Sequence, residues 1–546
     1  MTKTNGWALA LVATAALAAC GGGSDTPVAP SAVTIAGTAA KGAALAGAAV
    51  SIKCAAGTGT ATTGADGKYS VTITGANLPC ALKVAGTEGS VFHSVLAGTG
   101  TTGTFAANIT PLTEMLLAKV AGAAPAAFFA GLGSGTVVSA ASLTQGLDYL
   151  KTALAGATDL TGVNPVIDPL TIGNALDQKI DAVMAALASA GVTLAEVTTT
   201  IVANPNAPAV IGAPLAPPAS DCTWLRSGKY RMINPAETDA RWKAHVLTVD
   251  AATKTFRDQD SVPGSLTPAG ACRYTINDTD ATHTVMVSSS GVLVVHSQST
   301  TVATSRAVAI GLPEQLLPLT ELAGTWHLAV WNPTVVSTGT VAQTGEATID
   351  ASGQITAMVG CQGLAACSAN TGPFVRFAAN AGNGGFDMFE GAAAIGRGFM
   401  FKNLAGRAAL MYFTNDGEWG IATRKAALGA LPAVGTVSNF RQILLNGNGS
   451  IAAWSEDSTT VTAIDATAKT TTRLLASNNR VDMLTYDKPR DGLRYRAPNS
   501  CTINGAANNC AEVVQLPLQG MGITLTMSVS TNPATSFFQA SIGKPN

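Results

Sequence analysis

The sequence predicts a multidomain, mainly β protein with an N-terminal β-sandwich, a small all-α segment and three tandem antiparallel β-barrel or β-sandwich modules. Three observations lead to this prediction. Residues 33–108 alternate polar and apolar side chains between turn signals, and residues 109–206 carry apolar side chains at helical spacing. A Pro-rich stretch at 207–218 follows, and after it strand-like alternation returns, with six of the seven tryptophans in residues 219–546.

The N-terminus has the pattern of an export signal. Residues 1–19 carry one cation and then an apolar run of ~13 residues, too short to span a bilayer as a helix. The run ends in Leu17-Ala18-Ala19-Cys20, which resembles the lipobox of bacterial lipoproteins. An ordinary secretory signal with an incidental cysteine is the alternative.

The lipobox resemblance implies an exported chain that begins at a lipidated Cys20 and is anchored to the bacterial cell envelope by its acyl chains. Gly21 is not an aspartate, and for such lipoproteins this favours the outer membrane. Residues 20–32 are rich in Gly, Ser, Pro and Ala and are expected to form a flexible tether. The membrane is therefore the first expected partner.

The cysteines support an oxidising location. Setting Cys20 aside leaves eight of the nine, and an even number in an exported chain favours disulfide bonds. Local pairing is the simplest arrangement: Cys54 with Cys80, Cys222 with Cys272, Cys361 with Cys367, and Cys501 with Cys510. The last two spacings do not suit zinc, and no histidine lies nearby, so we expect no metal site.

Residues 33–108 are expected to form a small antiparallel β-sandwich. Thr62–Val71 is interpreted as a hairpin, in which Asp66-Gly67 supplies the positive φ and Tyr69 and Val71 share one face. The stretch resembles the carboxypeptidase regulatory-like (prealbumin-like) family, most specifically in Asp66-Gly67-Lys68-Tyr69. The resemblance implies a non-catalytic accessory or spacer domain.

Residues 109–206 are expected to be helical. Thr110 and Pro111 form a helix start, with Glu114 in the first turn. Further helices are expected at 140–155, about 172–190 and 194–202, and the charges of Asp177, Lys179 and Asp181 are expected on a solvated face. Residues 207–218 are expected to form an extended, semi-rigid linker.

Three weakly similar sequence motifs recur in the same order after the linker. They predict an internal repeat with modules at 219–315, 316–432 and 433–546. They are Gly228, Gly324 and Gly435 near each start; Asp250, Asp350 and Asp465, each followed by Ala; and the segments 309–313, 427–432 and 541–545 near each end. Each Asp-Ala step is interpreted as a hairpin turn.

The middle module carries a Gly-x-Trp opening at Gly324 and Trp326 and a late Arg424. This pattern resembles lipocalin-type barrels, in which the tryptophan closes the barrel floor and the arginine packs over it. The resemblance implies a barrel that could hold a small apolar ligand. A generic antiparallel barrel or sandwich is the alternative, since the signature is complete in one module of three.

Neither composition nor motifs indicate a catalytic centre. Acidic and basic residues are balanced, 33 against 32, which disfavours nucleic acid as a partner. The histidines lack metal-ligand spacing, no serine lies in a nucleophile elbow, and Glu390 and Glu418 fit strand edges better than an acid pair. We expect no cofactor.

The expected function is therefore that of a lipid-anchored envelope protein with a non-catalytic binding or structural role, whose partner is a protein, a glycan or a small apolar ligand. A carrier of apolar molecules in lipocalin-like barrels is one alternative. A hydrolase with a dispersed active site is the other, since catalytic groups can lie far apart in sequence.

Overall fold

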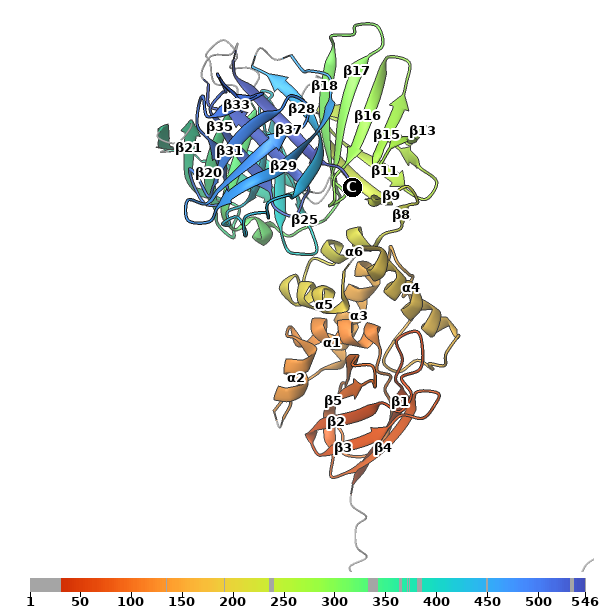
Figure 1. The fold of residues 1–546 in the computed structure, drawn as a ribbon. Coiled ribbons are helices and arrows are strands. Elements are labelled where there is room, and N and C mark those ends of the chain that lie inside the picture. The colour runs from red at the N-terminus through yellow and green to blue at the C-terminus, as the bar shows by residue number, and fades with distance from the viewer. Residues whose placement is uncertain are drawn as a thin grey trace, which may run out of the picture.

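In the computed structural model a β-sandwich, a helical layer and a group of three β modules follow one another along the molecule (Figure 1). The structure describes residues 31–133, 135–190, 192–234, 240–331, 342–362, 366–370, 372, 374–380, 385–447, 450–530 and 535–545. The predicted signal peptide, Cys20 and most of the tether lie outside these residues.

The sandwich consists of two sheets. The first has the order β4 (Lys68–Thr74), β1 (Ala32–Thr38), β7 (Gly103–Ala106), and the second has the order β3 (Thr58–Thr62), β2 (Ala49–Ala56), β5 (Asn77–Ala85), β6 (Val91–Leu96). The expectation of a purely antiparallel sandwich is wrong in one place, because β1 and β7 run parallel.

The predicted hairpin at Thr62–Val71 is also corrected. The turn forms, and the backbone N–H of Gly67 donates to the carbonyl of Gly64 over 3.0 Å. The strands on either side of it, however, belong to different sheets, so the turn carries the chain from one layer to the other. Turn chemistry is local, whereas the choice of strand partner depends on both layers.

Six helices follow: α1 (Pro111–Ala121), α2 (Pro125–Gly131), α3 (Ala140–Ala153), α4 (Ala175–Ala190), α5 (Leu194–Ala203) and α6 (Ala209–Leu215). The predicted start of α1 is observed. The Thr110 hydroxyl accepts a hydrogen bond from the N–H of Thr113, and the Thr113 hydroxyl accepts one from the N–H of Thr110, which forms a capping box.

One hydrophobic core joins the sandwich to the helices. It includes Ile35 and Leu82 from the two sheets together with Leu112, Leu150 and Ile180 from three helices. The strands and helices at 33–108 and 109–206 are therefore packed as one unit, because each layer buries its apolar face against the other.

Asp177 corrects the prediction of a solvated charged face on α4. Its side chain is buried, and its Oδ2 accepts a hydrogen bond from the N–H of Gly173 over 2.8 Å. The carboxylate thus caps the start of its own helix, where it meets the positive end of the helix dipole. Asp181, one turn later, is exposed as expected.

The predicted extended linker at 207–218 is wrong over most of its length, because it contains α6. Pro208 precedes this helix, where a missing N–H costs no hydrogen bond. Ile211 and Leu215 join the core of the helical layer, and Val210 joins the core of the middle β module. Burial of these side chains favours a helix over the extended form, and α6 makes the junction a packed one.

Module 1 (219–315) begins with β8 (Pro218–Ala219) and β9 (Cys222–Arg226), which pair with each other. A nine-stranded sheet and the short helix α7 (Ala240–Lys243) follow. The strands in chain order are β10 (Gly228–Ile233), β11 (Ala244–Asp250), β12 (Thr255–Arg257), β13 (Pro263–Ser265), β14 (Thr267–Gly270), β15 (Arg273–Asn277), β16 (Ala281–Val287), β17 (Leu293–Ser299) and β18 (Arg306–Pro313).

Module 2 (316–432) begins with the 3₁₀ turn η1 (Leu319–Leu322) and also has nine strands in one sheet. They are β19 (Gly324–Trp331), β20 (Ala342–Ile349), β21 (Ile355–Gln362), β22 (Ala366–Asn370), β23 (Arg376–Ala379), β24 (Phe386–Glu390), β25 (Ala393–Lys402), β26 (Ala408–Thr414) and β27 (Trp419–Arg424).

Module 3 (433–546) has ten strands. They are β28 (Val437–Asn446), β29 (Ser455–Asp465), β30 (Thr470–Leu475), β31 (Arg480–Tyr486), β32 (Arg494–Arg496), β33 (Cys501–Ile503), β34 (Ala506–Asn508), β35 (Val513–Leu518), β36 (Ile523–Ser528) and β37 (Phe537–Gly543).

The three modules share one order of strands. In each, the first long strand pairs with the second and also with the last: β10 with β11 and β18, β19 with β20 and β27, and β28 with β29 and β37. The predicted Asp turns follow the second strand in all three modules, with the Oδ1 atoms of Asp250, Asp350 and Asp465 accepting backbone N–H bonds. The repeat in sequence stays a prediction.

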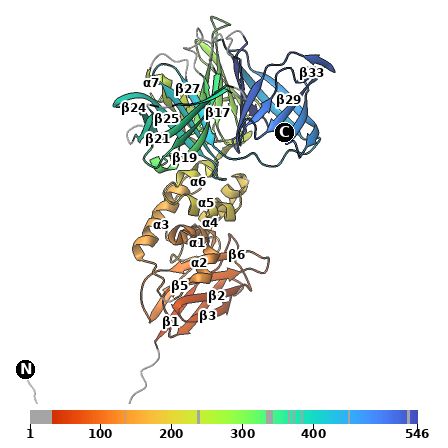
Figure 2. The same cartoon turned by 90° about the vertical axis from the view of Figure 1, so that its left-hand side faces the viewer.

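The modules stand side by side above the helical layer and enclose a common core (Figures 1 and 2). It includes Ile310 from module 1, Trp331 and Phe399 from module 2, and Leu516 and Phe538 from module 3. The indole of Trp419 lies 5.3 Å from the ring of Phe538 between centroids. Within the described residues, no single helix has the length and apolar character of a membrane span, although two sharply bent helix pairs pass that test together.

His296 lies at the contact between modules 1 and 3. It is buried, and its Nε2 donates to the carbonyl of Ala452 over 3.1 Å. Burial lowers the pKa of His296 below its ordinary value of 6.5, and nearby Arg306 lowers it further, against the opposing hydrogen bond to Ala452.

Since the unfolded chain binds the proton more readily, we expect neutral His296 to contribute to the free energy of unfolding above pH 6.5. This contribution should be lost progressively as the pH falls below 6.5. His296→Gln keeps an N–H donor and removes the titrating group, so its unfolding midpoint should vary less between pH 7 and pH 5. Thermal unfolding across this range checks the prediction, and identical pH profiles for the two proteins would contradict it.

Candidate functional site: the lumen of the C-terminal barrel

The strands of module 3 close into a ring. β30 pairs with β31, which completes a circle of eight strands in the order β28, β29, β30, β31, β32, β35, β36, β37. β33 and β34 extend from β31 outside this circle. An eight-stranded barrel has an interior that side chains can fill or that can hold one small ligand.

The apolar side chains of this barrel that belong to the core shared by the three modules point outward. On β36, Ile523, Leu525 and Met527 belong to the core shared by the three modules, whereas Thr524 and Thr526 line the interior. On β37, Phe538 and Ile542 likewise face outward. Because successive side chains on a strand alternate between faces, packing the apolar face against modules 1 and 2 leaves the polar face for the lumen.

The lumen contains a cavity of about 310 Å³ with four arginines and one aspartate among its lining residues: Arg473, Arg480, Arg494, Arg496 and Asp482. A second recess of about 410 Å³ lies between the barrel and the segment that connects modules 2 and 3. The two share Ser438, Thr459, Arg473 and Arg494 as wall residues. The arginines exceed the carboxylate in number, so the lining carries a surplus of positive charge.

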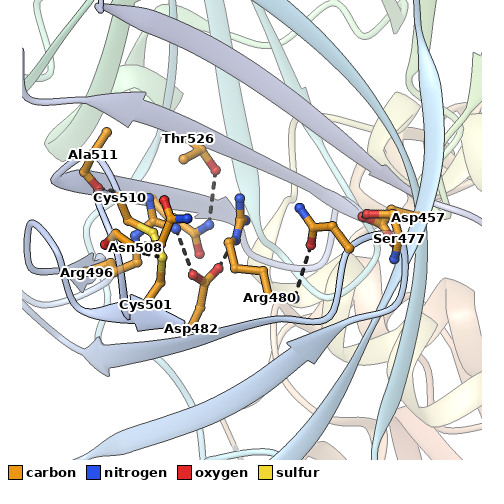
Figure 3. A network of polar contacts seen from close by, with 12 residues as sticks. Asp457, Ser477, Arg480, Asp482, Arg496, Cys501, Asn508, Cys510, Ala511 and Thr526 are labelled. Atoms are coloured by element: carbon orange, nitrogen blue, oxygen red, sulfur yellow. Dashed lines mark hydrogen bonds and ion pairs between the residues drawn. A yellow bond between two sulfur atoms is a disulfide. The ribbon is translucent and has the colours of Figure 1, made fainter. Parts of the chain in front are cut away.

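Asp482 engages two of the arginines (Figure 3). Its Oδ1 lies 2.9 Å from Nη1 of Arg496, and its Oδ2 lies 3.1 Å from Nη2 of Arg480. Nη2 of Arg496 also donates to the carbonyl of Ala511 over 2.8 Å. Ala511 directly follows Cys510, so the Cys501–Cys510 disulfide holds the chain that orients Arg496.

Arg473 and Arg494 are the remaining two arginines. In the described part of the chain, the Nε atoms of all four lumen arginines are buried without a hydrogen-bond partner, and it is Arg480 and Arg496 that pair with Asp482. The guanidinium carbon of Arg494 lies 4.7 Å from the ring centroid of Tyr486, so this group stacks on an aromatic face. Burial first, and then Arg494 and Arg480, lower the pKa of Arg473 to about 10, although Asp482 opposes the shift.

Arg473 therefore stays charged at neutral pH. A buried guanidinium prefers bidentate acceptors such as carboxylate or phosphate. The unpartnered N–H groups of Arg473 and Arg494 thus give the lumen the chemistry of a receptor for a small anion.

A band of neutral polar side chains completes the lining. Nε2 of Gln515 donates to Oγ1 of Thr526 over 3.1 Å, and Nε2 of Gln539 donates to Oε1 of Gln442 over 2.9 Å. The remaining amide oxygen of Gln515 is buried without a hydrogen-bond partner among the described residues.

All four predicted disulfide bonds are present in the structure, at Cys54–Cys80, Cys222–Cys272, Cys361–Cys367 and Cys501–Cys510. Each joins neighbours in the fold. Cys54 and Cys80, for example, are directly opposite each other on the paired strands β2 and β5. The predicted lipidation site, Cys20, lies outside the described residues.

The structure brings Gly324, Trp326 and Arg424 of module 2 together. The guanidinium carbon of Arg424 lies 4.4 Å from the ring centroid of Trp326, and Nε1 of Trp326 donates to the carbonyl of Leu322 over 2.8 Å. Gly324 has a φ of +129°, a backbone conformation that favours glycine, and the Arg424 side chain lies beside it. The contact of Arg424 with Trp326 is one part of what the lipocalin resemblance implies.

The interior of module 2 is occupied by its own side chains. Trp326 packs in one cluster with Phe377, Phe386, Met400 and Tyr412, and α6 contributes Val210 to the same cluster. These contacts give the Gly-x-Trp signature a packing role, and they disfavour module 2 as a site for an apolar ligand.

The two glutamates considered as an acid pair belong to separate parts of the module 2 sheet. Glu390 ends β24, whereas Glu418 lies in the turn before β27, and β25 and β26 lie between β24 and β27 in the sheet. Across the described ranges, no group of three His, Cys, Asp or Glu side chains could hold a metal ion.

The arginine lumen was not predicted from the sequence. Arg494 and Arg496 are two residues apart on β32, and Arg480 and Asp482 are two residues apart on the neighbouring strand β31. Residues two apart on a strand point to the same face of the sheet. This spacing is visible in the sequence. Whether that face points into the barrel cannot be predicted from the sequence, because it depends on how modules 1 and 2 pack against module 3.

No family model matches this sequence, and no curated protein matches it. Among solved structures, transferrin binding protein B from Neisseria meningitidis is similar at a TM-score of 0.19 and 7% identity, over 56% of this chain and 63% of that chain. A double mutant of transferrin binding protein B from Haemophilus parasuis gives a TM-score of 0.19 and 7% identity, over 55% and 65%.

A protein of unknown function from the DUF3598 family of Nostoc punctiforme gives a TM-score of 0.18 and 11% identity, over 42% of this chain and 99% of that chain. The chain thus spans less than two thirds of the two transferrin binding proteins. Likenesses this distant assign no family.

Proposed function

We propose that this chain is a non-catalytic binding protein of the cell envelope that takes a small anionic ligand into the lumen of the module 3 barrel. The observation that supports the proposal is a cavity of about 310 Å³ lined by four arginines and one aspartate, in which Asp482 pairs with Arg480 and Arg496. Arg473 and Arg494 are half-buried, and an anion between them would accept charge-assisted hydrogen bonds from both.

The lumen favours binding over catalysis. A general acid or base needs a pKa near the working pH, and a nucleophile needs an adjacent base. The ionisable side chains among the cavity's lining residues are arginines and Asp482, whose carboxylate is engaged by Arg480 and Arg496. Such groups can hold and orient an anion.

The proposed lipid anchor at Cys20 suits this role. The sandwich lies at one end of the molecule and the three modules at the other (Figures 1 and 2). A chain anchored ahead of β1 would hold the sandwich and helices as a stalk and present the barrel away from the bilayer. Mass spectrometry of the native protein tests the anchor, and an unmodified Cys20 would exclude it.

Calorimetric titration of the full mature chain with citrate, inorganic phosphate and sulfate tests the anion site. We expect saturable binding that weakens with added salt. Arg473→Gln or Arg494→Gln should each weaken binding by at least roughly tenfold, since a hydrogen bond to a charged group contributes about 1.5–3 kcal/mol.

Arg376→Gln is the matched control, because it also removes one positive charge but lies exposed on β23 of module 2. This variant should bind the probes as tightly as the unmodified chain. Failure of all three anions to bind, or equal weakening by the lumen and control substitutions, would overturn the proposed site.

A further inference from the structure

We infer that the anion is a hydroxylated acid of sugar size, with its carboxylate on Arg473 and Arg494 and its hydroxyl groups against the facing wall of the lumen. The inference rests on the proposed function and specifies its ligand. It comes from the arrangement of two chemically different walls around one cavity.

The charged residues gather on one side of the ring. Arg473 is on β30, Arg480 and Asp482 are on β31, and Arg494 and Arg496 are on β32, which are three consecutive strands. In a ring of eight strands, β31 stands opposite β37. The neighbours of β37 are β36 and β28, so these three strands form the facing wall.

The facing wall offers neutral hydrogen-bonding groups. Its lining residues are Gln442 on β28, Thr524 and Thr526 on β36, and Gln539 and Ser541 on β37. Amides and hydroxyls both donate and accept hydrogen bonds, and this is what sugar hydroxyls require. Phe440 and Phe537 line the same wall, where their rings can cover the C–H face of a sugar.

Gln515 distinguishes between classes of anion. Its Oε1 is a buried acceptor without a partner among the described residues, and the residue lines the cavity, so a ligand that supplies a hydrogen-bond donor suits this wall. Phosphate dianion and simple carboxylates bring mainly acceptors, whereas a sugar acid brings both a carboxylate and several O–H donors. The cavity of about 310 Å³ lies at the small end of ligand pockets, and this favours a single sugar unit.

The test is a calorimetric titration of the full mature chain with four probes: D-glucuronate, D-glucose, hexanoate and inorganic phosphate. Glucose keeps the hydroxyls without the charge, and hexanoate keeps the charge without the hydroxyls. We expect glucuronate to bind at least roughly tenfold more tightly than each of the other three, since a site built for hydroxyl groups rejects analogues that lack them.

The outcomes separate this inference from the proposed function. Equal or tighter binding of hexanoate or phosphate would overturn the sugar-acid ligand and leave the anion site in place. No binding of any charged probe would overturn the anion site itself. Galacturonate and its trimer as further probes separate two sources of the same chemistry: binding of the monomer alone indicates a free acid, and equal binding of the trimer indicates the end of an acidic polysaccharide.

Two lumen variants give an independent readout. Gln515→Leu removes the unpartnered acceptor and should weaken glucuronate binding while leaving phosphate binding unchanged, whereas Arg473→Gln should weaken both. Should Gln515→Leu fail to unfold cooperatively, Thr526→Val removes a hydroxyl group of the facing wall and should likewise weaken glucuronate binding and leave phosphate binding unchanged. An equal effect of Gln515→Leu on glucuronate and phosphate would contradict the hydroxyl contact.

Discussion

Asp482→Ala is expected to destabilise the module 3 barrel by about 3–5 kcal/mol, because it leaves Arg480 and Arg496 without their buried counter-charge. Asp482 is fully buried, and both of its carboxylate oxygens lie within 3.1 Å of a guanidinium nitrogen. Removing one member of a buried ionic group costs more than the whole group contributes, since the remaining charges stay desolvated.

Urea unfolding followed by tryptophan fluorescence measures this effect. Trp419 packs on Phe538 of module 3, and Trp454 lies within module 3 itself, so both report on the barrel. Asp482→Asn keeps an acceptor oxygen and should cost less than Asp482→Ala.

Asp465→Ala is the matched control for Asp482→Ala. Asp465 lies on the same barrel but is exposed and bonds only the backbone of its own turn, so its loss should cost under about 1 kcal/mol. Similar shifts for the two alanine variants would show that Asp482 is not the ionic centre of the lumen.

Removal of the Cys222–Cys272 bond should cost about 4 kcal/mol, the largest loss among the four disulfides on the chain-entropy model. The two cysteines are 50 residues apart in sequence, so the bond greatly restricts the unfolded chain. Both also belong to the core of module 1, and the carbonyl next to Cys272, that of Ala271, accepts a hydrogen bond from Nη2 of Arg441 in module 3 over 2.6 Å.

The double variant Cys222→Ser/Cys272→Ser, compared with the unmodified chain in urea, measures this loss. The matched control is Cys361→Ser/Cys367→Ser, whose cysteines are only 6 residues apart and whose bond should contribute about 2 kcal/mol on the same model. If both double variants lose the same free energy of unfolding, the stability that a disulfide contributes here is not set by the length of the loop it closes.

Local signals in the sequence predicted local structure well. Thr110 and Pro111 start α1 where capping chemistry places a helix start, and the Asp turns at Asp250, Asp350 and Asp465 form where a short carboxylate can bond its own backbone. The disulfide pairs also follow chain proximity. These features need only a few neighbouring residues.

Predictions that depended on a distant partner failed more often. The segment at 207–218 reads as an extended linker because of its prolines, yet Val210 and Ile211 find buried partners in two different cores and form α6. Asp177 failed for a local reason: its carboxylate accepts the N–H of Gly173 just before its own helix, so it is buried and not a surface charge. Spacing along the chain does not say what lies opposite.

The sequence by itself determined the mainly β class, the helical insert, the cysteine pairs and the three successive groups of strands, because periodicity and turn chemistry act over a few residues. The tertiary structure decided the functional candidate. Only the closing pair β30–β31 and the burial of the opposite strand face against modules 1 and 2 turn Arg473, Arg494 and Gln515 into the wall of one cavity. Strand alternation defines two faces, and the neighbouring modules, by covering the apolar face, leave the arginines inside.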